Sequence, residues 1–246
     1  MLSKAQNKYI RSLTQQKFRN EYNVFIAEGE KTAYEWLSGG SGIQMIIATE
    51  EWVAHNSKLL SIHPDTELHI VKEHELAALS GMQTPNKVLL VVSIPPLKNI
   101  PKINEWYIAL DNIQDPGNMG TIIRIADWFG IHHIICSPEC TDVYNPKVVQ
   151  SAMGSHLRVD IYESELVPFL GEMSIPKIAA TLDGENIYNM KRLAAGILII
   201  GNESKGISDA VIAMATQKVT IPGKGGAESL NAGVSTGILC ALLLPV

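Results

Sequence analysis

Polar side chains that could bind an anion or activate a nucleophile occur in three short stretches of the second half of the chain. The first stretch, residues 110–130, contains Asn118 and Arg124, and Arg124 is flanked by isoleucines. An arginine in so apolar a neighbourhood favours an anionic partner, either a carboxylate in a structural salt bridge or a phosphate of a ligand. Because Pro116 and Gly117 precede it, we expect Asn118 to belong to the loop before the helix that carries Arg124.

The second stretch, residues 201–206, holds Glu203 between two glycines. The glycine spacing is that of a P-loop, but Ile-Ser follows where Lys-Ser or Lys-Thr is required, which excludes nucleotide hydrolysis of that kind. A dinucleotide-binding fingerprint is missing as well, because residues 223–225 lack its third glycine. Taken alone, Glu203 is best interpreted as a carboxylate that caps a helix.

The third stretch begins at Lys218 and continues to the last residue. An apolar strand stops at Pro222, and the glycines that follow let the backbone approach a ligand or simply form a flexible connection. We expect Ser229 to be the N-cap of an apolar helix, whose free N–H groups favour electron-rich ligands. Asn231 lies early in that helix and needs a hydrogen-bond partner once it is buried.

The elements around these stretches alternate between strands and helices, which predicts an α/β domain with a mainly parallel sheet and helices on both faces. Ligands bind at the carboxyl ends of parallel strands, so the loops after Thr181, Ile200 and Ile221 are expected to form one site. Asp183 and Glu185 lie either in a ligand-binding loop or in a β-turn. The predicted strands are residues 106–110, 132–136, 157–161, 177–181, 196–200 and 219–221, and the predicted helices are residues 118–129, 146–153, 163–170, 207–215 and 229–243.

The first half also alternates, and it predicts a small α/β domain, residues 1–94. Three prolines that follow this domain predict a semi-rigid linker over residues 95–104. A second domain is predicted over residues 105–246. The predicted helices of the first domain are residues 1–20, 31–37, 50–60 and 73–79, and its predicted strands are residues 23–29, 43–48, 67–71 and 87–93, the last buried on both faces.

The composition supports a folded protein. With 46% hydrophobic and 18% charged residues the chain can bury a core, and its net charge of −5 argues against nonspecific coating of nucleic acid. The start of the chain is nevertheless locally basic, which indicates either an RNA contact or an ordinary solvated helix face. The basic residues of this segment are Lys4, Lys8, Arg11, Lys17, Arg19 and Lys31.

The cysteines and the apolar runs bear on location. Three cysteines without framework spacing favour a reducing compartment. The apolar runs are far shorter than the roughly 20 residues that a bilayer requires, so we expect a cytoplasmic protein without a membrane segment. No metal is predicted, because His132, His133, Cys136 and Cys140 form no paired metal-binding motif and are better explained by core packing.

Together, the order and spacing of the three stretches resemble the three motifs of the SpoU-type RNA 2′-O-ribose methyltransferases, a TrmH-like branch of the SPOUT superfamily. The resemblance is strongest over residues 106–244. Two departures affect local packing: Gly223 stands where the family often has Met, and Ala232-Gly233 where it often has Val-Ser. The matching residues are Asn118 and Arg124 in the first motif, Gly201, Glu203 and Gly206 in the second, and Ile221-Pro222 with Ser229-Leu230-Asn231 in the third.

This resemblance implies a deep trefoil knot, a homodimer, and transfer of a methyl group from S-adenosyl-L-methionine to a ribose 2′-hydroxyl of structured RNA. Residues 23–31 resemble, more weakly, the RNA substrate-binding domain of the same family. By resemblance, the cofactor site contains Thr181, Gly201, Ile221 and Leu230, and the catalytic residues are Asn118, Arg124, Glu203, Ser229 and Asn231.

The separate first domain favours ribosomal RNA over transfer RNA by analogy. Three alternatives remain: a transfer RNA 2′-O-ribose methyltransferase, a non-catalytic RNA-binding protein of the same fold, and an α/β enzyme with another nucleotide cofactor. The complete set of polar motif residues argues against the second alternative, and the failed nucleotide-binding patterns argue against the third.

Overall fold

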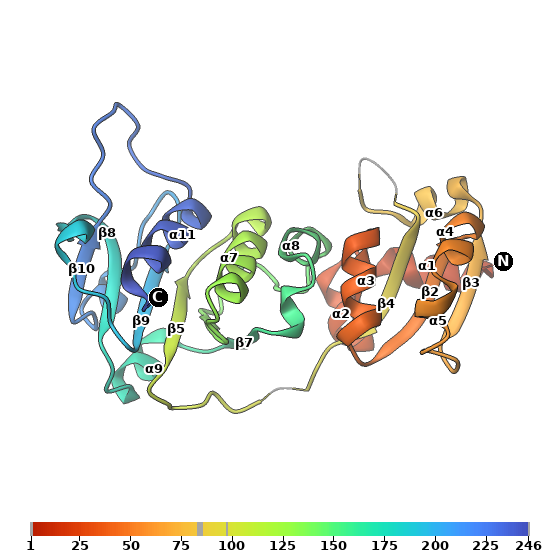
Figure 1. Ribbon diagram of the computed structural model, residues 1–246, viewed down its shortest axis with the longest axis horizontal. Coiled ribbons are helices and arrows are strands. Elements are labelled where there is room, and N and C mark those ends of the chain that lie inside the picture. The colour runs from red at the N-terminus through yellow and green to blue at the C-terminus, as the bar shows by residue number, and fades with distance from the viewer. Residues whose placement is uncertain (1, 83–85, 97, 246) are drawn as a thin grey trace. The chain divides into compact units, whose positions relative to one another are not determined.

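The computed structural model describes residues 2–82, 86–96 and 98–245. The chain folds into two compact units (Figure 1). Unit 1 comprises the chain up to residue 96 together with residues 142–157, and unit 2 comprises residues 97–141 and 158–246. A short segment from the second half of the sequence is therefore part of unit 1.

Unit 1 contains a mixed sheet with the strand order β1-β4-β2-β3. β4 is antiparallel to both β1 and β2, whereas β3 is parallel to β2. β1 and β4 are buried on both faces, as predicted for residues 87–93, because alternate side chains enter the hydrophobic clusters on opposite faces of the sheet. The strands are β1 (Val24–Glu28), β2 (Ile43–Thr49), β3 (Glu67–Val71) and β4 (Val88–Ser93).

Helices cover both faces of this sheet. Side chains of α1 and α6 contribute to one cluster, and side chains of α3, α4 and α8 contribute to the other. The helices of unit 1 are α1 (Lys4–Ser12), α2 (Gln16–Tyr22), α3 (Glu30–Gly39), α4 (Glu50–His55), α5 (Ser57–Leu60), α6 (Glu73–Leu79) and α8 (Pro146–Ala152), followed by the 3-10 turn η1 (Ser155–Leu157).

Two helices predicted as continuous are each divided in two. The predicted helix 1–20 is interrupted after Ser12, where the hydroxyls of Ser12 and Thr14 donate to nearby backbone carbonyls and Gln15 is extended. Such side-chain bonds compete with the helical pattern. The predicted helix 50–60 is interrupted at Asn56, whose side chain donates to the carbonyl of Trp52 at 2.8 Å.

Arg19 is buried rather than part of the basic surface that the sequence indicated. Its side chain is 2% exposed and donates to the carbonyl of Leu13 at 2.8 Å. Its guanidinium also forms an ion pair with Asp142. Arg19 therefore attaches the segment 142–157 to α2, and it must be subtracted from the charge that unit 1 presents to solvent.

A histidine in the same segment makes the stability of the protein depend on pH. The ring of His156 lies 2.9 Å from the carbonyl of Val143 through Nε2, and its buried Nδ1 has no hydrogen-bond partner among the described residues. Burial lowers the pKa of His156 from 6.5 to about 4. As the pH falls, the unfolded chain therefore takes up the proton first.

The stability that the neutral His156 contributes is complete above about pH 6.5 and is lost as the pH falls toward 4. We expect the free energy of unfolding of the protein to drop by about 2 kcal/mol between pH 7.5 and pH 5 because of this histidine. Urea unfolding of the wild type and of His156→Gln, which keeps a donor but does not titrate, measures the difference. Equal pH dependence in the two proteins would contradict this origin.

Unit 2 contains a parallel sheet with the strand order β10-β8-β9-β5-β6-β7, in agreement with the predicted fold class. β5 is buried along its whole length, as expected for a strand covered on both faces. The strands are β5 (Trp106–Asp111), β6 (His133–Cys136), β7 (Asp160–Glu163), β8 (Lys177–Asn186), β9 (Gly196–Gly201) and β10 (Gln217–Thr220).

Helices cover both faces of the parallel sheet, as predicted. Side chains of α9 and α10 form a cluster with alternate residues of β5 and β9. α7 and α11 contact each other, and they contact β6 and β9 respectively (Figure 1). The helices are α7 (Pro116–Trp128), α9 (Leu166–Glu172), α10 (Asp209–Ile212) and α11 (Ala232–Leu243), with the 3-10 turn η2 (Ile187–Asn189).

Several predicted boundaries in this unit were wrong by a few residues. β7 and α9 begin later than predicted, and α10 is shorter than predicted. The largest difference concerns β8, which continues from residue 181 to Asn186 through a shift of register against β10. Gly184 makes this continuation possible, because a Cβ there would lie 2.5 Å from the backbone nitrogen of Val219.

Of the residues considered for metal binding, His133 and Cys136 are buried as expected, whereas His132 precedes β6 and is exposed, so its predicted place in the core was wrong. His133 lies on β6 and stacks on Tyr107 with ring centroids 5.1 Å apart, and burial lowers its pKa. Among the described residues, no group of three or more His, Cys, Asp or Glu is placed to hold a metal ion. Within the same ranges, the helices are too short or too polar to cross a membrane.

Candidate active site

The parallel strands of unit 2 end at one edge of the sheet, and the polar stretches found in the sequence follow those ends. Asp111 closes β5, Gly201 closes β9 and Thr220 closes β10. The loop after β5 leads into α7, and the loop after β10 leads into α11 (Figure 1). Because α7 and α11 contact each other, their first turns bring the first and third stretches together.

Asn118 belongs to the first turn of α7 and not to the preceding loop, so that prediction was wrong. The helix begins at Pro116, whose fixed φ and missing N–H suit the first helical position. Asp115 is the N-cap, and its Oδ1 accepts a hydrogen bond from the backbone nitrogen of Asn118 at 2.8 Å. The Asn118 side chain is 8% exposed, so its amide requires partners inside the protein.

Those partners come from the other two stretches. The amide nitrogen of Asn118 donates to Oε1 of Glu203 at 2.5 Å. The amide oxygen of Asn118 accepts from Nδ2 of Asn231 at 2.6 Å. The oxygen of Asn231 in turn accepts from the backbone nitrogen of Val234 at 3.2 Å and caps α11. We call this chain of bonds through Glu203, Asn118 and Asn231 the amide relay.

The hydrogen bonds of the amide relay fix the orientation of both asparagine side chains. An ionised carboxylate only accepts hydrogen bonds, so Glu203 turns the NH₂ group of Asn118 toward itself and leaves the oxygen facing Asn231. The same reasoning fixes Asn231, whose oxygen must face the N–H groups of α11. One carboxylate therefore orients two amides and the start of a helix, and Glu203 does not act as the helix cap that its sequence context suggested.

Asn202, which the sequence did not single out, holds the loop that carries Glu203. Its Nδ2 donates to the carbonyl of Asn112 at 2.9 Å, and its Oδ1 accepts from the backbone nitrogens of Ser204 and Lys205. The backbones of Asn202 and Gly206 also pair with each other. An asparagine that begins a tight loop is a signal for such a turn, and it was the clue available in the sequence.

Gly201 and Asp111 complete the support of this loop. A Cβ on Gly201 would lie 2.4 Å from backbone atoms of Gly206 and Ile207, so the loop folds directly onto this glycine. The buried carboxylate of Asp111 accepts from the backbone nitrogen of Ser208 at 2.7 Å and fixes the chain just beyond the loop. Asp111 is a second positioning residue that was missed, because an aspartate at a strand end is also typical of an ordinary turn.

Two predicted catalytic residues lie outside the amide relay. Arg124 is on the exposed face of α7, six residues beyond Asn118. Its neighbours Ile122 and Ile123 are the buried ones. Ser229 lies in the exposed loop before α11 and is not the N-cap, because Asn231 takes that role. Helix α11 accordingly begins at Ala232 and not at Ser229.

The residues predicted to hold a cofactor lie on or after β8, β9 and β10. Thr181 follows the last residues of β8 that pair with β9, and its buried Oγ1 has no hydrogen-bond partner among the described residues. Residues 222–231 form an exposed loop, in which Leu230 is 48% exposed. A buried hydroxyl without a partner beside an exposed glycine loop fits a polar ligand held largely by backbone groups.

Comparison with known proteins places this geometry in a family. Residues 105–241, more than half of the chain, match the family model described as the SpoU rRNA Methylase family. The chain belongs to that family. Residues 4–90 match a second model, the MRM3-like substrate binding domain.

Related proteins cover nearly the whole chain. RlmP of Bacillus subtilis, a 23S rRNA (guanosine(2553)-2′-O)-methyltransferase, is 26% identical over 93% of this chain and 92% of its own. A solved structure from Porphyromonas gingivalis, assigned to the TrmH family of RNA methyltransferases, is 34% identical with a TM-score of 0.84 and covers 99% of this chain and 98% of its own. An rRNA methyltransferase from Sinorhizobium meliloti, solved with AdoMet bound, is 29% identical with a TM-score of 0.85 and covers 98% of this chain and 95% of its own.

Membership of this family confirms the predicted fold class. The six-stranded parallel sheet of unit 2, counted over the described residues, is that of SpoU methyltransferases, whose fold contains a trefoil knot. The family uses S-adenosylmethionine as methyl donor.

Two substitutions of Asn231 are expected to separate its bond to Asn118 from its capping of α11. Asn231→Ala removes both the cap of α11 and the bond to Asn118, and it should lower the free energy of unfolding by about 1 kcal/mol. Asn231→Ser keeps a capping hydroxyl but is too short to reach Asn118. Both variants should lose about tenfold in methyl transfer, the value of one hydrogen bond, whereas only the alanine variant should melt earlier. Full activity of Asn231→Ser would contradict a role for the relay.

Proposed function

We propose that this protein transfers a methyl group from S-adenosylmethionine to the 2′-hydroxyl of a ribose in ribosomal RNA. The amide relay is the observation that carries the proposal, because it joins three distant stretches of chain at the ligand-binding edge of the sheet. Two relatives support the substrate class, since RlmP and a 32% identical protein of Streptomyces viridochromogenes are both named as 2′-O-methyltransferases of 23S rRNA.

The cofactor site that we propose contains Thr181, Gly201, Ile221 and Leu230. The hydroxyl of Thr181, which has no hydrogen-bond partner among the described residues, supplies a hydrogen-bonding group for the ligand, and Gly201 lets the loop after β9 fold closely against the end of the strand. Bound S-adenosylmethionine supplies an electrophilic methyl group on a sulfonium. The exposed loop that carries Leu230 supplies backbone donors and acceptors to hold such a ligand.

In the reaction, the ribose 2′-oxygen would form a bond to the methyl carbon while the carbon–sulfur bond breaks in line with it. The electron pair of that bond would stay on sulfur as a neutral thioether, and the hydroxyl proton would pass to water. We assign to Arg124 the binding of the substrate phosphate beside that hydroxyl and the stabilisation of the developing negative charge. A guanidinium keeps its proton and is a poor base, so Arg124 acts as a cation. Asn118, Glu203, Ser229 and Asn231 orient the ribose and the cofactor around it.

We further propose that residues 1–94 bind the RNA and residues 105–246 carry out the transfer, with residues 95–104 as the linker. The two family models, which match residues 4–90 and 105–241, support this division.

The free thiols Cys136, Cys140 and Cys240 suit a reducing compartment, and we propose the cytoplasm as the place of action.

A homodimer is part of the proposal. Helix α11 is apolar on all sides, yet Val234 is 51% exposed, and Trp128 at the end of the adjoining α7 is 84% exposed. An exposed apolar face of this kind is expected to be covered by a second copy of the chain. Sedimentation equilibrium of the full chain measures the mass of the particle, and a monomer at micromolar concentration would contradict the dimer.

The substrate class is tested by methyl transfer from radiolabelled S-adenosylmethionine to total RNA from cells that lack this protein. The RNA is then separated into ribosomal and transfer RNA. We expect label in the ribosomal fraction. Label in transfer RNA alone would establish the alternative substrate, and absence of both label and cofactor binding would favour a non-catalytic RNA-binding protein of the same fold.

A further inference from the structure

The positive charge of unit 1 is concentrated in its first two helices. Residues 2–22 contain five Lys or Arg and one Glu, whereas residues 23–96 contain four Lys and nine Asp or Glu. Arg19 is buried in its ion pair, which leaves four exposed cations on α1 and α2. A polyanion that approaches unit 1 is therefore attracted to these two helices and repelled by the rest of the unit.

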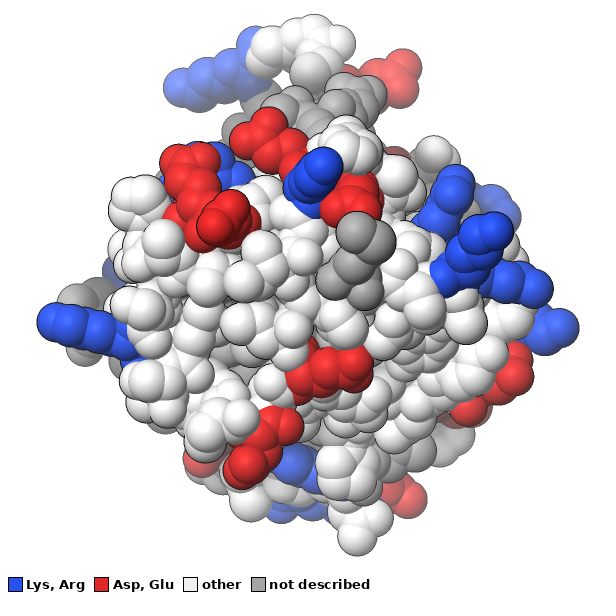
Figure 2. All heavy atoms as spheres, turned by 90° about the vertical axis from the view of Figure 1, so that its right-hand side faces the viewer, with Lys and Arg blue, Asp and Glu red and all other residues white. Residues whose placement is uncertain are grey.

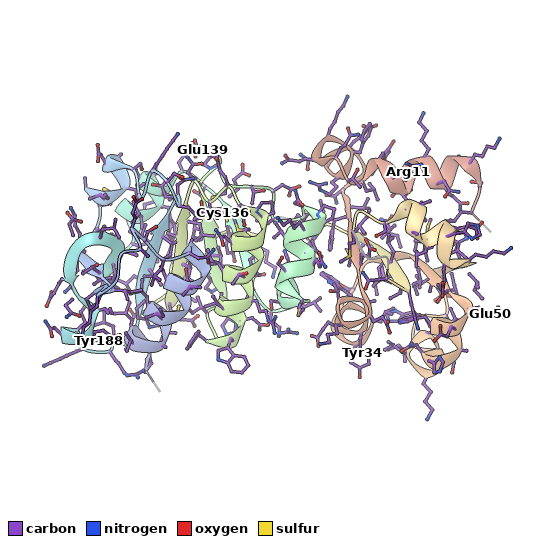
Figure 3. All side chains as sticks on the ribbon, turned by 90° about the horizontal axis from the view of Figure 1, so that it is seen from above. Arg11, Tyr34, Glu50, Cys136, Glu139 and Tyr188 are labelled. Carbon is purple, nitrogen blue, oxygen red and sulfur yellow. The ribbon has the colours of Figure 1, made fainter. Side chains whose placement is uncertain are left out.

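The cations of α1 lie on one side of the helix. Lys4, Lys8 and Arg11 follow one another at intervals of four and three residues and are exposed, whereas Ile10 is buried in the core. Figure 2 shows the largest group of Lys and Arg side chains at one margin of its view. Figure 3 shows Arg11 on the outer side of α1, directed away from the sheet of unit 1.

Aromatic side chains connect α1 to α2. Tyr9 of α1 packs edge-on against Tyr22 of α2 at 5.0 Å, and Phe18 stacks parallel to Tyr22 at 6.3 Å with an interplanar angle of 13°. Lys17 lies over the Phe18 ring at 5.8 Å. Tyr22 is 44% exposed, so it presents aromatic surface to solvent although it is packed on one side.

We propose that the α1–α2 face, formed by Lys4, Lys8, Arg11, Lys17, Phe18 and Tyr22, is the surface of unit 1 that binds RNA. An unpaired base stacks on Tyr22, and the flanking phosphates contact the cations. This inference rests on the proposed function, which requires an RNA substrate. Single-stranded RNA is recognised by aromatic rings among cations, whereas an acidic protein requires only the cations, so the aromatic cluster favours RNA.

The charge part of the proposal is tested with the full chain and an unmethylated transcript of 23S rRNA. Filter binding at several salt concentrations compares Lys8→Gln/Arg11→Gln with the matched control Lys58→Gln/Lys72→Gln, which removes two exposed lysines elsewhere on unit 1. We expect at least tenfold weaker binding and a salt slope smaller by about 1.5 in the first variant. The control should bind within about twofold of the wild type. Equal losses in both variants would overturn the proposal.

The stacking part is tested by Tyr22→Leu, which keeps an apolar side chain against Tyr9 but removes the ring. The control is Tyr34→Leu on α3, because Tyr34 is 57% exposed and lies on the opposite side of unit 1 from Arg11 (Figure 3). We expect about tenfold weaker binding for Tyr22→Leu, near-normal binding for Tyr22→Trp, and no change for Tyr34→Leu. Equal affinities of the two leucine variants would overturn stacking at this site.

Two further readouts separate this proposal from its alternatives. Competition by polyglutamate as effective as that by polyuridylate at equal charge would assign the face to an acidic protein and overturn the RNA assignment. Variants of the face should raise KM for RNA and leave kcat at saturating RNA unchanged, since none of these residues belongs to the active site. If the wild type binds the transcript in the expected pattern but transfers no methyl group, the proposed function fails while the α1–α2 face stands.

Discussion

Replacement of Arg124 by alanine is expected to lower the methyl-transfer rate at saturating RNA and S-adenosylmethionine by about 10²- to 10³-fold, the usual effect of removing one charge-stabilising donor. The side chain lies on the exposed face of α7, so its removal takes little from the core. Cofactor binding and thermal stability should therefore stay close to those of the wild type. Arg124→Lys should restore only part of the rate, because an ammonium keeps the charge but lacks the planar fork that binds phosphate bidentately.

Single-turnover methyl transfer measures this effect, and calorimetric titration with S-adenosylmethionine verifies that the variant is intact. Arg158→Ala is the matched control, since Arg158 is an exposed arginine of the same unit that pairs with Asp127 on α7. Removal of a surface ion pair costs at most about 1 kcal/mol, so the control should keep its activity. A near-normal rate for Arg124→Ala with intact folding would remove Arg124 from the mechanism.

Replacement of Gly201 by alanine is expected to abolish measurable cofactor binding, a loss of at least about 100-fold, and to lower the melting temperature. The added Cβ would lie 2.4 Å from backbone atoms of Gly206 and Ile207, and backbone cannot move aside as a flexible side chain can. The loop must shift outward, which breaks the pairing of Asn202 with Gly206 and carries Glu203 away from Asn118. One methyl group thus dismantles the amide relay.

Gly39→Ala provides the control for this prediction. Gly39 is the last residue of α3 in unit 1, and an added Cβ there meets no atom within 4 Å. The same chemical change should therefore leave stability and cofactor affinity nearly unchanged. Calorimetric titration of both variants measures their cofactor affinity, and thermal unfolding measures their stability. Wild-type cofactor affinity in Gly201→Ala would show that the loop is not held as the structure indicates.

The parallel sheet could be predicted from the sequence, because its strands are short apolar segments separated by helical ones. What the sequence did not provide was the pairing of side chains across the fold. Asn118 contacts partners 85 and 113 residues away, and no local pattern encodes such separations. The sequence motifs identified the residues of the amide relay. The orientation of the two amides follows only from the positions of Glu203 and of the first turn of α11.

Errors at the site arose where two local rules competed. Pro116 and Gly117 are typical of loops, yet proline also suits the first helical position, and Asp115 supplies the cap that decides between them. Ser229 and Asn231 are both good N-caps, and the bond to Asn118 favours Asn231. Arg19 resembled a surface cation because its partner, Asp142, lies 123 residues away in the sequence.

The central claim is that the site methylates a ribose 2′-oxygen, and the most direct test is the position of the methyl group in the product. A 2′-O-methyl group removes the nucleophile that alkali uses to cleave the neighbouring phosphodiester. We would incubate the full chain with labelled S-adenosylmethionine and unmethylated 23S rRNA, and then digest the RNA completely with alkali. The label is expected in an alkali-stable dinucleotide. Label released in mononucleotides would place the methyl group on a base and contradict the claim.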